Sequence, residues 1–120
     1  MTQARFNGIW LGHFNDDVAN SVIKEDWFKA CIDAHLKLGI EPRGAKTVGV
    51  DPSDVGNDPC GYAARHGMVF TDIDEIEAEN GNRKMDEACK RAIAFGTDSF
   101  GYDADGLGAT LRDNVDLAFN

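Results

Sequence analysis

Two kinds of hydrophobic spacing alternate along the chain. Apolar residues three or four positions apart, such as Trp27, Cys31 and Leu38, predict amphipathic helices. This spacing occurs in three stretches, residues 24–38, 83–95 and 106–119. Shorter apolar runs predict strands over residues 45–50, 61–66, 68–73 and 98–102. The expected order is therefore helix, strand, hairpin, helix, strand, helix.

This order predicts an α/β fold with a mixed sheet and flanking helices. His66 and Gly67 separate two strand-like runs and predict a hairpin turn, whereas residues 74–82 are polar and predict a loop or the frayed start of a helix. The helix over 83–95 would connect the first and last strands, and a helical crossover places two strands side by side and parallel. We expect residues 1–44 to form an extended arm and a lead-in helix, and residues 45–120 to form the core of a single domain.

Composition narrows the functional classes. The chain has 120 residues, which suffices for one domain with a hydrophobic core. Its formal net charge of −9 argues against a basic nucleic-acid surface and suits either a carboxylate-rich metal site or an ordinary acidic surface. Basic residues occur in short groups such as Arg83 and Lys84, which are typical of solvated faces.

The cysteines and the hydrophobic runs bear on the cellular compartment. Cys31, Cys60 and Cys89 are far apart and odd in number, so we expect reduced thiols rather than a disulfide framework. No apolar run reaches the roughly 20 residues that a membrane helix needs. The N-terminus lacks the layout of a signal peptide. We therefore expect a cytoplasmic protein.

Two aspartates are expected at one edge of the predicted sheet. Asp51 directly follows the first predicted strand, and Asp103 directly follows the last. Because the carboxyl ends of neighbouring parallel strands meet, these side chains should lie close together. Carboxylate oxygens suit Mg²⁺ and Mn²⁺, and two such ions can catalyse phosphodiester hydrolysis. Asp58 and Asp105 are near enough in sequence to contribute. A solvated turn would explain the same aspartates, and on spacing alone it is the commoner interpretation.

Three stretches carry a resemblance to a known family. They are WLGHFNDDVANSVIKEDW at 10–27, VGVDPSDVGND at 48–58 and YDADGLGATLRDNV at 102–115. In this order they resemble the C-terminal nuclease domain of the large terminase subunits of tailed phages, which package and cut viral DNA. Other ribonuclease H-like proteins, such as junction resolvases, fit less well because of the N-terminal stretch.

The resemblance implies a ribonuclease H-like fold and an endonuclease that cuts double-stranded DNA with two Mg²⁺ or Mn²⁺ ions. By position, Asp51 and Asp103 match the catalytic acids, and Asp58 matches a further metal ligand. Asp105, two residues after Asp103, would lie beside these ligands without binding the metal itself. Lys46 and Arg65 would contact the DNA backbone. Implied partners are the terminase ATPase domain, the small terminase subunit and the portal protein, in the cytoplasm of a bacterial host.

Two departures from the family pattern suggest an alternative. The family has a third acid on a later element, whereas this sequence ends at Asn120, so we expect the fold to be incomplete at its C-terminus. The phosphate-binding motif of the ATPase half, GxxxxGK[ST], is also missing from the sequence. The alternative is a catalytically inactive terminase fragment that acts as a docking module. An uncovered sheet edge or apolar face would then favour self-association.

Overall fold

The computed structural model describes residues 23–54 and 58–120. They divide into two compact units, Met1–Glu41 and Pro42–Asn120, each of which is described by itself. The predicted extended arm over residues 6–14 and most of the motif at 10–27 lie outside the described residues. In the described part of the chain, every helix is too short or too polar to cross a membrane.

The first unit contains two short helices in place of the single helix predicted over 24–38. They are α2 (Glu25–Cys31) and α3 (Ala34–Lys37). The helix breaks because Ile32 is extended and Asp33 has a φ of 55°, a left-handed conformation that aspartate tolerates better than most residues. Trp27 and Leu38 on the predicted stripe are 58% and 71% exposed, so this stripe is not buried within the described residues.

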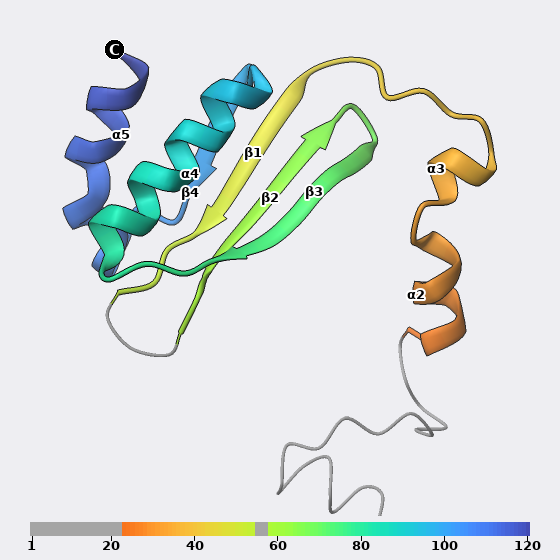
Figure 1. The fold of residues 1–120 in the computed structure, drawn as a ribbon, viewed down its shortest axis with the longest axis horizontal. Helices are drawn as coiled ribbons and strands as arrows, with labels where there is room; N and C mark the ends of the chain where they lie inside the picture. Colours follow the sequence, from red (N-terminus) through yellow and green to blue (C-terminus); the bar gives the residue numbers. More distant parts are fainter. Residues whose placement is uncertain (1–22, 55–57) are drawn as a thin grey trace, which may run out of the picture. The chain divides into compact units, whose positions relative to one another are not determined.

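The second unit is built on a four-stranded sheet with the order β3-β2-β1-β4 (Figure 1). Its strands are β1 (Lys46–Asp51), β2 (Cys60–His66), β3 (Val69–Ile76) and β4 (Ser99–Tyr102). β1 pairs antiparallel with β2 and parallel with β4, and β2 pairs antiparallel with β3. The predicted mixed sheet, its hairpin and its parallel pair are thus confirmed.

The hairpin differs from expectation in the length of β3. The strand continues through residues 74–76, which the polar composition assigned to a loop. A β-bulge explains the error, because Thr71 has no partner between the pairs Arg65–Phe70 and Ala64–Asp72. The extra residue shifts the inside–outside alternation within β3, so a period of two no longer marks the strand in the sequence.

Helices cover one face of the sheet. These are α4 (Gly81–Phe95), the 3₁₀ segment η1 (Gly106–Leu111) and α5 (Arg112–Phe119). The helix predicted over 106–119 therefore begins as a 3₁₀ turn, which fits its glycine-rich start. α4 begins at Gly81 because the Asn80 side chain accepts a hydrogen bond from the Arg83 N–H at 3.1 Å.

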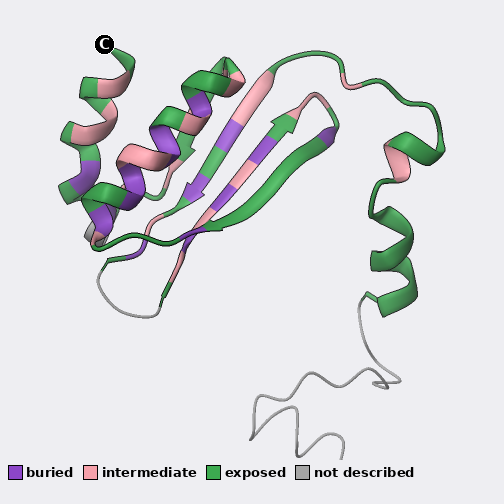
Figure 2. Ribbon diagram, in the orientation of Figure 1, coloured by how far each residue is buried: buried purple, intermediate pink, exposed green. Residues whose placement is uncertain are grey.

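The hydrophobic core lies between these helices and the sheet (Figure 2). Its members are buried apolar residues of α4, the sheet and η1, including Val48, Val50, Tyr62, Ile76, Met85, Ala88, Cys89, Ala92 and Leu111. The apolar stripe predicted on α4 is confirmed except for Ile93, which is 52% exposed. The three cysteines are free thiols, as expected.

The opposite face of the sheet carries no helix of this unit (Figure 1). Strand alternation places Gly49 and Asp51 of β1 on this face, because Val48 and Val50 point into the core. Their neighbours across the sheet are Ala63 and Gly61 of β2, which are half-buried. We call this surface the open face. Its low floor of glycine and alanine leaves the Asp51 side chain accessible.

Candidate metal centre

Asp51 and Asp103 lie at the carboxyl ends of the two parallel strands. Val50 of β1 is registered with Tyr102 of β4, and each aspartate is the next residue in its chain. Neighbouring strands are about 4.8 Å apart, so the two backbones approach closely at this edge. Both side chains are exposed. Because Val50 and Tyr102 contribute to the core side, alternation directs Asp51 toward the open face.

The loop after β4 holds Asp103 through its own backbone. Oδ1 of Asp103 accepts a hydrogen bond from the Asp105 N–H at 3.0 Å, which forms an Asx turn. Gly108 of η1 packs against the Asp103 carbonyl so closely that a Cβ atom there would overlap it. The turn and this contact therefore both help to set the position of Asp103.

The loop after β1 is fastened to the start of α4. Lys84 is only 3% exposed, and its Nζ donates hydrogen bonds to Ser53 Oγ at 3.0 Å, to the Asp54 carbonyl at 2.6 Å and to the Asp58 carbonyl at 2.9 Å. Ser53 Oγ donates in turn to the Asp58 carbonyl at 2.6 Å. Both ends of the loop that begins at Asp51 are thereby joined to one helix.

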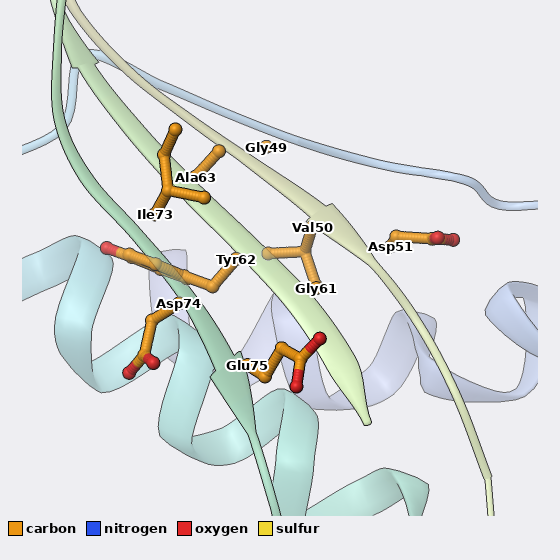
Figure 3. A pocket seen from close by; sticks show the side chains of 9 residues that line it. All are labelled: Gly49, Val50, Asp51, Gly61, Tyr62, Ala63, Ile73, Asp74 and Glu75. Carbon is orange, nitrogen blue, oxygen red and sulfur yellow. The ribbon is translucent and has the colours of Figure 1, made fainter. Parts of the chain in front are cut away.

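A hollow of about 520 Å³ lies on the open face beside Asp51 (Figure 3). Gly61 forms part of its floor, and a Cβ atom at Gly61 would come within 3.4 Å of the Asp51 Cβ. Glu75 of β3 borders it from the far side, because Gly61 is registered with both Asp51 and Glu75. In Figure 3 the Asp51 carboxylate points away from Glu75. Glycine at position 61 keeps the space next to Asp51 clear.

The ionisable side chains near this edge of the sheet differ in their hydrogen-bond partners and in their burial. Asp74 accepts a hydrogen bond from Arg91 Nη1 at 2.7 Å, and this bond lowers the pKa of the Asp74 carboxyl below its ordinary value. The same bond, with a second one to Glu87, raises the pKa of Arg91. Asp74 is therefore hydrogen-bonded to Arg91 of α4, on the core side of β3. Burial raises the pKa of the Cys60 thiol, so this cysteine is a poor metal ligand.

Comparison with known proteins identifies the relatives of this chain. This chain is 43% identical, over the matched region, to the nuclease domain of the large terminase subunit gp2 of bacterial virus Sf6, with a TM-score of 0.77. The match covers 83% of this chain and 44% of that chain. A mutant of the same domain, solved with manganese and β-thujaplicinol, also gives 43% identity, with a TM-score of 0.76 and coverage of 82% and 43%. The chain is thus similar in sequence and in fold to nuclease domains of a phage large terminase subunit.

Two further observations define this relationship. The chain spans less than half the length of the terminase structures it matches, and one of these, a mutant of gp2, was solved with calcium. No protein-family model matches the sequence, and no curated protein does either. The likeness to phage terminase nucleases and the ribonuclease H-like fold, both expected from the sequence motifs, are confirmed.

The structure brings only some of the predicted site residues of this terminase relative together. Asp51 and Asp103 share one edge of the sheet. Asp58 is attached to the Asp51 loop through its carbonyl, and its side chain is exposed. Among residues 23–54 and 58–120, no three histidine, cysteine or acidic side chains converge in a geometry that would hold a metal.

Lys46 and Arg65 lie at a different part of the sheet. They sit at the opposite end of β1 from Asp51, because Lys46 begins the strand and Arg65 is registered with Thr47. The five-residue length of strand between Lys46 and Asp51 corresponds to roughly 17 Å. Lys46 Nζ also donates to the Phe95 carbonyl at 2.9 Å and lies 5.0 Å from the Phe95 ring centre. Arg65 is exposed.

Sequence reasoning missed two contributors to this terminase-like site. Lys84 was grouped with Arg83 as part of a solvated face, which is wrong because it is buried. Its position four residues before Ala88 and eight before Ala92 places it on the buried stripe of α4, and this spacing was the available signal. Glu75 was assigned to a loop, because the bulge in β3 obscured its place in the sheet.

Proposed function

We propose that this chain provides the first two acids of a metal-dependent endonuclease site that cuts double-stranded DNA during packaging of a phage genome. The observation that carries the proposal is the placement of Asp51 and Asp103 at the ends of adjacent parallel strands, in a chain 43% identical to a terminase nuclease domain. Manganese and calcium in the solved relatives support the use of a divalent ion.

The residues present suit Mg²⁺ or Mn²⁺. Mg²⁺ is commonly held by one or two carboxylates, with water and substrate phosphates completing its octahedral shell. Asp51 and Asp103 supply two carboxylates, and Asp58 supplies a third from the connecting loop. Two ions bound at such a site activate a water and stabilise the leaving oxygen of a phosphodiester. Asp105 contributes through its backbone N–H, which orients the Asp103 carboxylate.

The chain's own residues set the geometry of the proposed reaction. The open face beside Asp51 has a floor of Gly49, Gly61 and Ala63, which lets a bulky polyanion approach the carboxylates. Arg65 and Lys46 would contact the DNA backbone about 17 Å away from the cutting centre, at the far end of β1. In the complete packaging motor we expect the ATPase domain, the small subunit and the portal protein as partners, within the bacterial host cell.

A metal titration tests the proposal. We would measure Mn²⁺ binding to the 120-residue chain by electron paramagnetic resonance, using wild type, Asp51→Asn and Asp103→Asn. We expect each substitution to weaken binding at least tenfold, because removing either charge removes a direct ligand. A plasmid-cutting assay in Mn²⁺ should lose its signal in parallel.

Matched controls separate the site from general acidity. Asp72→Asn removes one exposed negative charge from β3 and should leave Mn²⁺ binding unchanged. Equal binding by wild type, Asp51→Asn and Asp103→Asn would refute the nuclease proposal. The docking-module alternative would then become the better explanation.

A further inference from the structure

The contact between Lys84 and the loop after Asp51 has no role in the function proposed so far. Lys84 is the fourth residue of α4, close to the positive end of the helix dipole, and it is almost completely buried. Both features are unfavourable for a cation. All three of its N–H groups are nevertheless used, and each partner is a neutral oxygen of the loop. These three hydrogen bonds offset part of the cost of burying the cation, and they hold the loop against α4.

The loop is attached to α4 at several points around Lys84. Ser53 is 8% exposed and bridges Lys84 to the Asp58 carbonyl. The Gly81 N–H, at the first residue of α4, donates to Asp54 Oδ1 at 3.4 Å. A Cβ atom at Gly81 would lie 3.2 Å from the Ser53 carbonyl oxygen, so the loop and the helix are in close contact. Lys84 is the centre of this contact.

We propose that Lys84 is a positioning residue that fixes the separation and orientation of the metal ligands Asp51 and Asp58. Its bond to Ser53 fixes the chain two residues after Asp51, and its bond to the Asp58 carbonyl fixes Asp58 itself. Buried as it is, Lys84 does not reach the DNA. This inference rests on the proposed metal site and adds that the site depends on the buried lysine of α4.

A competing electrostatic effect makes the test decisive. The positive charge of Lys84 lies close to the proposed site, since its Nζ is 2.9 Å from the carbonyl oxygen of Asp58. By Coulomb repulsion alone, the same charge weakens binding of a divalent cation, so its removal would tighten binding. Loss of the positioning contact has the opposite effect, because removing a group that orients metal ligands typically lowers the affinity for the metal about 10- to 100-fold. The sign of the change distinguishes the two effects.

The first experiment compares Mn²⁺ affinity in wild type and Lys84→Met, which removes the charge and the donors at similar side-chain length. We expect the dissociation constant for Mn²⁺ to rise about tenfold. This is the lower end of the range of about 10- to 100-fold, because removing the repulsion between Lys84 and the cation partly compensates the loss of the contact. Lys90→Met is the matched control, since it makes the same substitution at an exposed position of the same helix. Its affinity should change by less than about twofold.

Hydrogen exchange supplies a readout independent of the metal. Amides of residues 53, 54, 58 and 60 should exchange faster in Lys84→Met than in wild type, while those at the centre of α4 remain protected. If Lys84→Met does not fold, Ser53→Ala replaces it, because this variant keeps the charge and loses the bridge between Lys84 and Asp58. It should weaken Mn²⁺ binding in the same direction.

The outcomes separate this inference from the proposed function. Unchanged or tighter Mn²⁺ binding in folded Lys84→Met, or in Ser53→Ala, would overturn the positioning role while leaving the metal site intact. Mn²⁺ binding that is insensitive to Asp51→Asn would instead overturn the proposed metal site. Weaker binding in Lys84→Met together with faster exchange in the loop supports the inference.

Discussion

Substituting Gly108 tests how precisely the loop after β4 holds Asp103. The backbone of Gly108 does not require glycine for its conformation, because its φ is not positive. A Cβ atom there would nevertheless lie 1.7 Å from the carbonyl oxygen of Asp103 and 2.7 Å from its carbonyl carbon. Real Cβ atoms essentially never lie closer than 3.0 Å to such an atom, so Gly108→Ala must move Asp103 or η1 by more than about 1 Å.

This displacement is large for a metal ligand. Functional groups must be held within roughly 0.5 Å of their productive geometry, and a misplacement of about 1 Å can cost about 100-fold in activity. We therefore expect Gly108→Ala to weaken Mn²⁺ binding at least tenfold and to reduce plasmid cutting further. Overpacking of this kind costs about 1–3 kcal/mol of unfolding free energy, which leaves a domain of ordinary stability folded.

The assay is a Mn²⁺ titration combined with urea denaturation, with Gly49→Ala as the matched control. Gly49→Ala adds the same methyl group on the open face, two residues before Asp51, and no atom lies within 4 Å of the added Cβ. Alanine in a strand interior is more favourable than glycine by about 0.5–1 kcal/mol, so this control should be at least as stable as wild type. If Gly108→Ala binds Mn²⁺ and unfolds like wild type, the contact with Asp103 does not position the ligand.

Four further substitutions and one labelling experiment test the fold. Gly67→Ala should cost about 1–3 kcal/mol in urea denaturation, because Gly67 has a φ of 60° and a Cβ atom would overlap the backbone carbonyl of Arg43. Met85→Ala, at a position only 1% exposed, should cost about 2–5 kcal/mol, whereas Leu117→Ala, at 86% exposure, should change stability by less than about 0.5 kcal/mol. Burial raises the pKa of Cys89 to about 11, so iodoacetamide should label the exposed Cys31 first at pH 8, as mass spectrometry of the native chain would check. The pKa of Cys89 is higher in the folded chain than the unfolded value of 9.0, so the stability that depends on a neutral Cys89 is complete below pH 9 and is lost as the pH rises through about 11. Urea denaturation midpoints at pH 8 and pH 10.5 measure this loss of stability. The loss should be smaller in Cys89→Ala, which has no thiol at this position to ionise.

Hydrophobic periodicity predicted the parts of the fold in which local preference and packing agree. α4 has both a capping side chain at Asn80 and a stripe of small apolar residues, so its sequence and its burial point to the same helix. The parallel pairing of β1 with β4 followed from chain connectivity, since a helical crossover permits little else. This connectivity is why the approach of Asp51 to Asp103 could be expected before the structure.

The errors occurred where a tertiary feature overrides the local pattern. The bulge at Thr71 hid the last residues of β3, and with them the acid that borders the hollow beside Asp51. The helical stripe of residues 24–38 has the right period, yet the chain breaks at Asp33, where a left-handed residue interrupts the hydrogen-bond ladder. The burial of Lys84 depends on loop oxygens that come together only in the folded chain. A lysine is usually exposed, so the residue type of Lys84 alone predicted a solvated environment, which is wrong.

The placement of the acids relative to the core separates the proposed metal site from the residues that stabilise the fold. Asp51, at the end of β1, and Asp58 and Asp103, in loops, have exposed side chains, whereas the core residues Val48 and Val50 of β1 are buried. Neutralising one of these acids thus removes a proposed metal ligand without opening a cavity, and it relieves repulsion between neighbouring carboxylates. Lys84 and Gly108 differ from the acids, because each connects the core to a ligand. Substitutions at these two positions should therefore lower both stability and metal affinity, whereas Asp51→Asn should lower metal affinity alone.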